Sequence, residues 1–286
     1  MIVVTTPTGT IGRQVLDHLV ATDAEIRVIV RDASRLPAAV RARVEVVEGS
    51  HGGPAVVAKA LAGTVFWLVP PPSPQAPSLE AAYLDFTRPA IDAFTDRVVG
   101  ISALGRGTPM AAHAGYVTAA LAADDLITAS GVAYRALTMP SFMENVLRQV
   151  DAIRGQGAFF GPTDAGLKLP IVATRDIAAV AARLLLDDTW TGSEEVPVLG
   201  PEDLSHDGMA RIMTEVFGRP VRYQQVPWDA FRATMAGHMS DAMVQGRIDM
   251  MRAKNDGLDL AAAPRTRMPT TFRQWCAEVL HPAVYG

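Results

Sequence analysis

The stretch TTPTGTIG, residues 5–12, lies where the apolar run IVVTT gives way to a segment of helical period. Between a first strand and a first helix, dinucleotide-binding folds carry a turn of the pattern T-G-x-x-G-x-x-G. Gly9 and Gly12 stand in register with that pattern, and Thr6 takes the place of its first glycine. The order of strand, turn and helix therefore predicts that residues 5–12 bind the phosphates of a dinucleotide.

Each glycine of the turn has its own physical task. Gly9 allows the backbone to approach a pyrophosphate, and Gly12 allows the helix to pack closely on the strand. The free N–H groups and the positive dipole end of the helix favour an anion. Thr6 cannot adopt the freest conformations of glycine, so we expect the turn to be rearranged around Pro7 and Thr8. The alternative is a turn that only joins a strand to a helix.

Short apolar runs rich in β-branched residues alternate with longer segments of helical period, which is typical of a parallel sheet covered by helices. We expect strands at IVVTT, EIRVIV, VEVVE, TVFWLV, RVVGIS and AYRALT. Parallel strands need crossover helices, which we expect at residues 10–20, 54–61, 78–94 and 110–130. The sequence thus predicts an α/β fold with a doubly wound parallel sheet, a Rossmann core.

After residue 138 the expected elements become shorter. A helix is expected from Thr174 as its N-cap, with Asp176 in the first turn. Residues 196–227 indicate a strand, a capped helix closed by Gly218-Arg219-Pro220, and a second strand. These pieces suit a smaller region added to the core.

Composition limits the possible functions. Of the 286 residues, 49% are hydrophobic and 20% charged, and the net charge of -4 lacks the basic excess that nucleic acids attract. A single cysteine, Cys276, excludes an internal disulfide, and six scattered histidines show no metal-ligand spacing. We find no basic leader and no apolar run near the roughly 18 residues of a membrane span. We expect a cytoplasmic monomer or homodimer with no metal, nucleic-acid or membrane partner.

The end of the second expected strand, VIVRDASR, indicates which dinucleotide is bound. An acidic residue there would accept the ribose hydroxyls of NAD, whereas an arginine pairs with the 2′-phosphate of NADP. Arg31 directly follows the strand, and Arg35 lies four residues on. Two guanidiniums suit a phosphate, so we expect NADPH as the cofactor. Asp32 is the rival, either for an NAD hydroxyl or as the N-cap of the next helix.

The segments VTTPTGTIGRQV, VIVRD, ISALG, ASGVAYRALTMPSFMEN, LPIVATRDIAAVAARLL and VLGPEDLS together resemble the NmrA-like branch of the atypical short-chain dehydrogenase/reductases. The resemblance extends to about residue 235, and TMPSFMEN is its most specific part. It implies a Rossmann core with an NAD(P) site over residues 1–155. It also implies a smaller, interleaved substrate-binding region over residues 156–286, whose helix 174–187 packs back on the core.

The resemblance further implies roles for individual residues. Those that would line the phosphates are Thr6, Thr8, Gly9, Thr10 and Ile11. Arg31 would bind the ribose phosphate. Those that would flank the adenosine are Val69 and Pro70, and those near the nicotinamide are Ser102, Pro140 and Phe142.

Short-chain reductases commonly use a serine, a tyrosine and a lysine, the last two spaced Y-x-x-x-K on one helix. Ser102 ends the fifth expected strand and Tyr116 lies on the next helix, but the fourth residue after Tyr116 is Ala120. Without the lysine, the tyrosine should keep a pKa of roughly 10, so it can donate a proton but is a poor base. We expect Ser102 and Tyr116 to be the catalytic candidates, in the direction of reduction. The alternatives are that Tyr116 only packs in its helix and that a substrate hydroxyl supplies the proton.

Methionines and aromatic residues gather in the C-terminal part. Met235, Met239 and Met243 recur at intervals of four, which predicts one face of a helix. Core packing explains such a stripe, but pliable methionines also suit a large, flat, apolar ligand. The expected substrate-binding residues are Trp67, Phe142, Trp228, Met235 and Met239. Residues 253–267, small and polar, are a candidate lid.

These features favour an NADPH-dependent ketoreductase for a ketone or quinone on a bulky aromatic or polycyclic molecule, as in the tailoring of aromatic polyketides and antibiotics. The rival is a non-catalytic redox sensor that binds NADP and a protein partner. The resemblance leaves both open, because members of this branch often lack the full set of serine, tyrosine and lysine.

Overall fold

The computed structural model of the chain describes residues 1–260 and 267–286. The chain divides into two compact units, each built from three segments. Unit 1 contains residues 1–103, 119–138 and 177–196, and unit 2 contains residues 104–118, 139–176 and 197–286. The two units are therefore interleaved along the sequence. The assignment of cofactor binding to residues 1–155 and of substrate binding to residues 156–286 stays a prediction.

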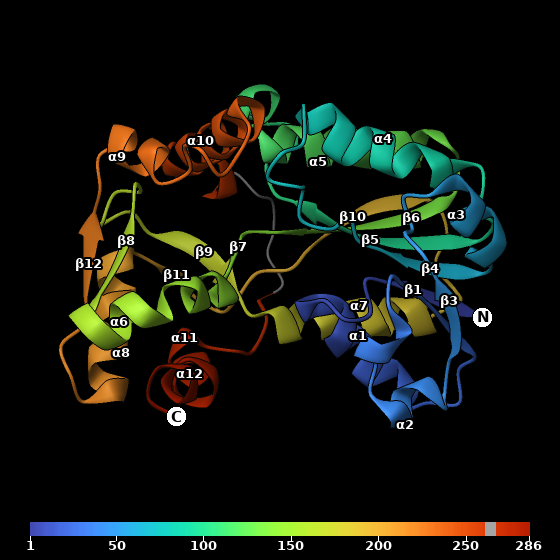
Figure 1. The fold of residues 1–286 in the computed structure, drawn as a ribbon, viewed down its shortest axis with the longest axis horizontal. Coiled ribbons are helices and arrows are strands. Elements are labelled where there is room, and N and C mark those ends of the chain that lie inside the picture. Colours follow the sequence, from blue (N-terminus) through green and yellow to red (C-terminus); the bar gives the residue numbers. More distant parts are fainter. Residues whose placement is uncertain (261–266) are drawn as a thin grey trace. The chain divides into compact units, whose positions relative to one another are not determined.

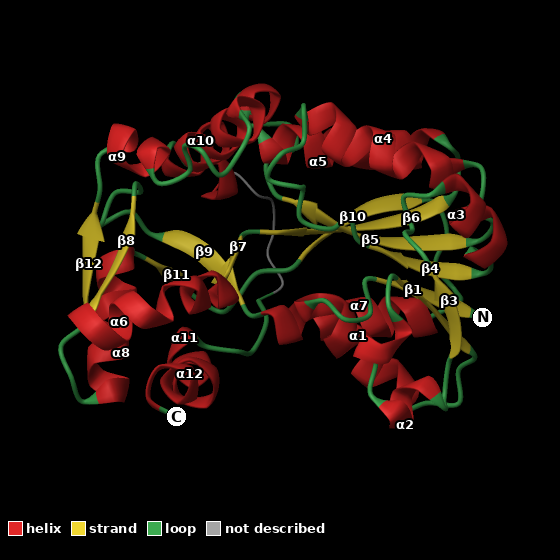
Figure 2. Ribbon diagram, in the orientation of Figure 1, coloured by secondary structure: helices red, strands yellow, loops and turns green. Residues whose placement is uncertain are grey.

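Unit 1 is built around a seven-stranded sheet (Figure 1, Figure 2). The strands are β1 Ile2–Thr5, β2 Ile26–Val30, β3 Glu45–Glu48, β4 Thr64–Trp67, β5 Arg97–Ala103, β6 Ala133–Met139 and β10 Ser193–Pro197. Their order across the sheet is β3, β2, β1, β4, β5, β6 and β10. The pairs β1–β2, β2–β3, β1–β4 and β4–β5 are parallel. The order reverses between β1 and β4, so the predicted doubly wound sheet is confirmed.

Helices cover both faces of this sheet. They are α1 Thr10–Val20, α2 Ala38–Arg41, α3 Pro54–Ala60, α4 Leu79–Ile91, α5 Tyr116–Ala129 and α7 Thr174–Leu186. Figure 1 shows α3, α4 and α5 over one face and α1 and α7 over the other. Every residue of β1 and β4 is buried, as expected of central parallel strands that are covered on both sides.

The prediction of one continuous helix over residues 110–130 is wrong. A short 3-10 helix, Ala111–His113, comes first, and α5 begins only at Tyr116. Between them, Gly115 has a φ of +54°, and a Cβ atom there would lie 2.0 Å from the carbonyl oxygen of Gly246. Two backbones meet here too closely for a side chain, so Tyr116 lies in the first turn of α5.

Unit 2 contains two small sheets, with the strand orders β11-β9-β7 and β12-β8. Their strands are β7 Ser141–Phe142, β8 Ala158–Gly161, β9 Leu169–Val172, β11 Asp203–Leu204 and β12 Arg222–Gln225. The helices are α6 Val150–Gln156, α8 His206–Phe217, α9 Trp228–Ala233, α10 Asp241–Asn255, α11 Phe272–Trp275 and α12 His281–Tyr285. Large side chains with exposed fractions of at most 2% form its core, among them Met143, Phe159, Phe272 and Trp275.

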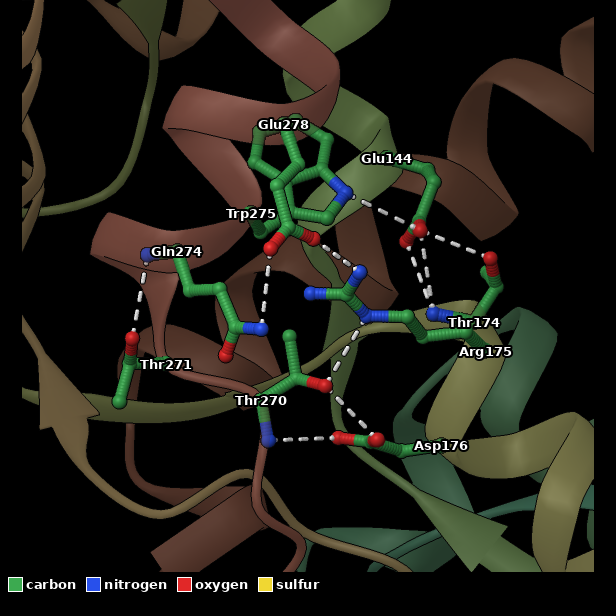
Figure 3. Close-up of polar contacts among 9 residues, drawn as sticks. All are labelled: Glu144, Thr174, Arg175, Asp176, Thr270, Thr271, Gln274, Trp275 and Glu278. Atoms are coloured by element: carbon green, nitrogen blue, oxygen red, sulfur yellow. Dashed lines mark hydrogen bonds and ion pairs between the residues drawn. The ribbon is translucent and has the colours of Figure 1, made fainter.

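A polar cluster joins the beginning of α7 to the C-terminal segment of unit 2 (Figure 3). The carboxylate of Glu144 accepts hydrogen bonds from the Thr174 N–H at 3.1 Å, Thr174 Oγ1 at 2.7 Å and Trp275 Nε1 at 3.2 Å. Asp176, in the first turn of α7, accepts from the N–H and the hydroxyl of Thr270. Glu144 and Trp275 are 131 residues apart in the sequence, and Asp176 and Thr270 are 94 residues apart, so the cluster joins distant segments of the chain.

The predicted lid, residues 253–267, falls in part on residues 261–266, which lie outside the described residues. The described residues before that stretch are anchored in unit 2. Leu258 has an exposed fraction of 0%. Lys254 Nζ and Asp259 Oδ2 form a buried ion pair at 2.6 Å.

Replacing Glu144 by glutamine should lower the free energy of unfolding by about 1.5–3 kcal/mol, the range for hydrogen bonds to a charged group. All three donors reach Oε1, which a glutamine oxygen can replace, but the bonds to a neutral amide lose their charge assistance, and the amide NH₂ in place of Oε2 faces the Thr174 N–H as a second donor. Urea-induced unfolding measures the difference. Asp151→Asn is the control, because the Asp151 side chain is 98% exposed and lies 3.6 Å from the exposed guanidinium of Arg154. An unchanged stability of the Glu144 variant would contradict the role of this cluster.

Candidate functional site

A buried threonine at the end of β1 ties this strand to its neighbour. Thr5 Oγ1 donates to the carbonyl oxygen of Phe66 at 2.9 Å and accepts from the Leu68 N–H at 3.1 Å. Both contacts lie at the carboxyl ends of β1 and β4, where the strand order reverses. In doubly wound sheets this reversal opens the crevice in which ligands bind. The turn over residues 5–12 therefore starts at the ligand-binding edge of the sheet.

Thr6 keeps the left-handed conformation of the glycine that the motif has in its place. Its φ is +51°, the one positive value at a non-glycine residue in the described part of the chain. The expected rearrangement around Pro7 and Thr8 is therefore wrong. The Gly9 N–H donates to the Thr6 carbonyl oxygen at 2.9 Å, and a Cβ atom on Gly12 would lie 2.1 Å from the same oxygen. The hydrogen bond from Gly9 helps to offset a conformation that costs a threonine about 1–2 kcal/mol, and the lack of a side chain on Gly12 leaves room for it.

The turn also leaves donors for an anion. Thr6 Oγ1 is buried and has no hydrogen-bond partner within residues 1–260 and 267–286. α1 begins after Gly9 with no side-chain cap and no acidic residue in its first turn. Proteins rarely leave such groups unsatisfied, and a phosphate satisfies both. The turn thus fits a pyrophosphate. The hydroxyls of Thr8 and Thr10 and the backbone N–H of buried Ile11 can donate further hydrogen bonds to it.

Two exposed arginines follow β2. The Arg31 guanidinium makes no hydrogen bond or ion pair with the described residues, and Arg35 lies in the short 3-10 helix Ala33–Arg35. Asp32 accepts from Ser34 Oγ at 2.6 Å and from the Ser34 N–H at 2.9 Å, and these bonds lower the pKa of its carboxyl. The Asp32 carboxylate therefore caps that helix, which leaves the two arginines accessible to a phosphate.

Three predicted site residues lie at the end of β4 or just after it. Val69 and Pro70 are half-buried in the loop that follows this strand. Trp67 has an exposed fraction of 2% and packs in the core of unit 1 against Phe86 and Phe94. Its burial argues against the predicted contact with a substrate, whereas the loop residues stay candidates for the adenosine side.

Ser102 belongs to a buried cluster of hydroxyls around a carboxylate in unit 1. Ser102 Oγ and the Tyr134 hydroxyl both donate to Asp124, the tyrosine at 2.6 Å. Asp124 has an exposed fraction of 4%. Gly100 makes room for the cluster, since a Cβ atom there would lie 2.3 Å from the Tyr134 hydroxyl. A serine carries one hydroxyl proton, so Ser102 in this arrangement offers a ligand an acceptor rather than a donor.

The sequence-based prediction missed Asp124, although a signal for it was present. Asp124 lies three residues after Leu121 and three before Ile127, and both of these are buried. Residues at that spacing share one face of a helix. A carboxylate on the buried face of a helix needs polar partners, and the hydroxyls of Ser102 and Tyr134 supply them.

Tyr116 lies in unit 2, at the beginning of α5. Its hydroxyl donates to the carbonyl oxygen of Met243, in α10, at 3.0 Å. Burial raises the pKa of Tyr116, and the charge of Arg247 acts in the opposite direction. The position of the usual lysine is occupied by Ala120. The tyrosine is therefore protonated at neutral pH, and its proton is already engaged.

Pro140 and Phe142 follow β6, in unit 2. Pro140 is buried, and Phe142 is a half-buried residue of β7. β7 pairs in parallel with β9, where Phe142 lies opposite Val172. A short strand thus holds the Phe142 ring, and its predicted contacts with nicotinamide and substrate stay predictions.

The prediction of one helical stripe of methionines is wrong. α9 and α10 are separate helices, because Gly237 has a φ of +78° and Ser240 caps α10 by accepting from the Met243 N–H. Met235 and Met239 lie between the two helices, whereas Met243 belongs to α10. The interval of four therefore does not mark one helix face here.

A small apolar cluster accounts for part of this segment. Met235, with an exposed fraction of 6%, packs with Val244 and Ile248, and Trp228 and Met239 border the cluster. Core packing, the default explanation for the methionines, thus accounts for Met235. Contact with a substrate stays a prediction for Trp228 and Met239.

Other chemistry has little support in the described residues. Residues 1–260 and 267–286 contain no group of three or more His, Cys, Asp or Glu side chains placed to hold a metal ion. Within the same ranges, we find no helix with the length and apolar character needed to span a bilayer. Burial raises the pKa of the Cys276 thiol to about 12, which keeps it protonated at neutral pH.

Comparison with known proteins identifies two families. The sequence model of a family described as NAD(P)H-binding matches residues 7–188, more than half of the chain. The model of the NmrA-like family matches residues 125–263. The first match includes most of the turn and the arginines after β2, and the second includes β7 and α10.

Two relatives and one solved structure illustrate the similarity. A (4-alkanoyl-5-oxo-2,5-dihydrofuran-3-yl)methyl phosphate reductase from Streptomyces griseus is 29% identical over 97% of both chains. An NAD(P)H azoreductase from Xenophilus azovorans is 29% identical over 85% of both. The NADPH-dependent quinone oxidoreductase of Escherichia coli, complexed with NADPH, shares the fold with a TM-score of 0.74 and 22% identity over 90% of both chains. The chain therefore belongs to the NAD(P)H-binding family, and its residues 125–263 are similar to the NmrA-like family.

Proposed function

We propose that the protein uses NADPH to reduce a ketone or quinone on a bulky aromatic small molecule. Membership of the NAD(P)H-binding family supports the class of reaction. The observation that carries the proposal is the turn after β1, where the unpartnered Thr6 hydroxyl and the uncapped start of α1 fit a pyrophosphate. The name of one relative specifies an azo compound and that of the other an unsaturated lactone with an acyl group, and both are conjugated hydride acceptors.

Arg31 supports NADPH rather than NADH as the hydride donor. Its guanidinium is exposed directly after β2 and has no other partner in the described residues. The neighbouring Asp32, the rival ligand for a ribose hydroxyl, is already used as a helix cap. Bound NADPH supplies the hydride for the carbonyl carbon, and the carbonyl oxygen takes up a proton.

The source of that proton distinguishes this protein from reductases with a complete serine, tyrosine and lysine set. The Ser102 hydroxyl donates its hydrogen bond to buried Asp124, and the Tyr116 hydroxyl donates to the Met243 carbonyl oxygen. Ala120 provides no cation that would draw the tyrosine toward a ligand. We infer that the proton comes from water or from a substrate hydroxyl, and that catalysis rests on holding hydride donor and carbonyl together.

The same engaged hydroxyls favour the second candidate function, a non-catalytic sensor that binds NADP. A panel of polycyclic ketones and quinones, mixed with protein and NADPH, separates the two. Oxidation of NADPH that depends on the acceptor, followed by absorbance at the nicotinamide band, supports the reductase. Tight NADPH binding without turnover on any member of the panel supports the sensor.

Arg31→Ala should weaken the binding of NADPH roughly 10-fold or more and that of NADH little. Only NADPH loses a charge-assisted hydrogen bond, which contributes about 1.5–3 kcal/mol. Isothermal titration calorimetry with each cofactor measures both affinities. Arg41→Ala, an exposed arginine of α2, is the matched control. An equal loss for both cofactors would refute the assignment of Arg31.

Tyr116→Phe should reduce the rate of ketone reduction only a few-fold, and Ser102→Ala should have a similarly small effect. Both hydroxyl protons are committed to acceptors inside the protein, so neither variant removes a proton donor. Steady-state kcat on one reducible member of the panel measures this, with NADPH affinity as the control. A positioned general acid contributes roughly 100-fold or more. A loss of that size in the Tyr116 variant would show that Tyr116 is the donor after all.

A further inference from the structure

An arginine of α10 is partly buried in unit 2 without a counter-ion. The Arg247 guanidinium makes no hydrogen bond or ion pair with the described residues, and its Nε is inaccessible to solvent. The six residues outside the description, 261–266, include no Asp or Glu. The guanidinium carbon lies 5.9 Å from the centroid of the Phe231 ring. Buried charges in proteins are nearly always paired, whereas this partly buried charge has no partner among the described residues, and a ligand can supply one.

A second arginine lies close enough for its charge to act on the first. Arg148 is exposed near the end of the 3-10 helix Met143–Gln149 and makes no hydrogen bond or ion pair within the described ranges. Burial, and after it the charge of Arg148, lower the pKa of Arg247. Two positive charges that act on each other, neither of which is paired with a carboxylate of the described residues, raise the local positive potential.

The backbone fixes Arg247 before any ligand arrives. Gly246, directly before it, is the residue that meets Gly115 too closely for a Cβ atom. One turn earlier in α10, the carbonyl oxygen of Met243 accepts a hydrogen bond from the Tyr116 hydroxyl. Tyr116 cannot neutralise Arg247, because burial raises the pKa of the phenol and keeps it protonated. The backbone that carries the guanidinium is therefore fixed, and the described residues provide no counter-ion for it.

We propose that Arg247 and Arg148 bind an oxyanion, a carboxylate or phosphate group carried by the substrate. Guanidiniums bind both groups through paired N–H donors. The Phe231 ring beside Arg247 adds an aromatic surface, which suits an acid attached to an aromatic ring. The identification of the ligand as the substrate rests on the proposed function. The oxyanion site itself does not, since both arginines and the Phe231 ring belong to unit 2.

Binding of 2-naphthoate and of its neutral amide, 2-naphthamide, to the full chain tests this without any turnover. By calorimetry we expect the acid to bind at least about 10-fold more tightly, as one charge-assisted hydrogen bond allows. Added salt should reduce this preference. Arg247→Met and Arg148→Met should each remove most of this preference, because they weaken the binding of the acid far more than that of the amide. Arg211→Met, an exposed arginine of α8, should keep it.

Equal binding of acid and amide by the unmodified protein overturns the proposal, and so does a preference that survives in both variants. Inorganic phosphate tests for a free anion as the ligand. It should compete with 2-naphthoate only far above the Kd of the acid, because it has no ring to contact Phe231. Phosphate that binds as tightly as the acid would overturn the assignment to the substrate.

Thermal unfolding provides an independent readout. Arg247→Met removes an unpaired, partly buried charge, so it should raise the midpoint of unfolding rather than lower it. A lower midpoint would mean that Arg247 has a structural partner, which counts against the site. If Arg247→Met does not fold, Arg148→Met still tests the binding of the acid, because an exposed residue can be replaced without disturbing the fold.

Failure of this inference differs from failure of the proposed function. A protein that binds 2-naphthoate through Arg247 but reduces no ketone or quinone keeps the oxyanion site and loses the reductase. A protein that reduces neutral quinones but binds the acid no better than the amide keeps the reductase and loses the site.

Discussion

The left-handed turn at Thr6 is the constraint on which the rest of unit 1 depends. Its carbonyl oxygen is approached from two sides, by the Gly9 N–H and by Gly12, where no Cβ atom fits. These contacts hold the first turn of α1 at the carboxyl end of β1, and Thr5 ties that end to β4. Backbone strain of this kind persists where surrounding contacts over-determine it, commonly at binding sites. The strained residue and the group that needs a ligand are here the same threonine.

The central strands and α1 could be predicted because their signals are local. Runs of β-branched residues and one helical period suffice, and the bounds of α1, Thr10–Val20, are those expected. The break before Tyr116 could not be predicted, since Gly115 is needed only through its contact with Gly246, far along the chain. The prediction that the methionines share one helix face was wrong for a related reason. Their interval of four continues across the turn at Gly237, which the spacing alone does not reveal.

Some residues of the candidate site could likewise be predicted from the sequence, and others could not. The glycines and Arg31 could be placed by motif and by their position after a strand. The roles of Asp124 and Arg247 could not be predicted, because they depend on other elements of the fold. Two hydroxyls donate to the Asp124 carboxylate, and the described residues provide no counter-ion for the Arg247 guanidinium. The missing lysine at Ala120 was visible in the sequence, but the commitment of both candidate hydroxyls to internal acceptors was not.

The interleaving of the two units bears on how the chain folds as it is synthesised. Unit 2 begins at residue 104 but takes its longest segment, residues 197–286, from the other end of the sequence. Glu144 leaves the ribosome long before Trp275, which follows it by 131 residues. Over that interval the apolar side chains around Met143 and Phe159 lack the C-terminal helices that cover them. We expect the nascent chain to expose apolar surface until then, which makes it a natural client of chaperones.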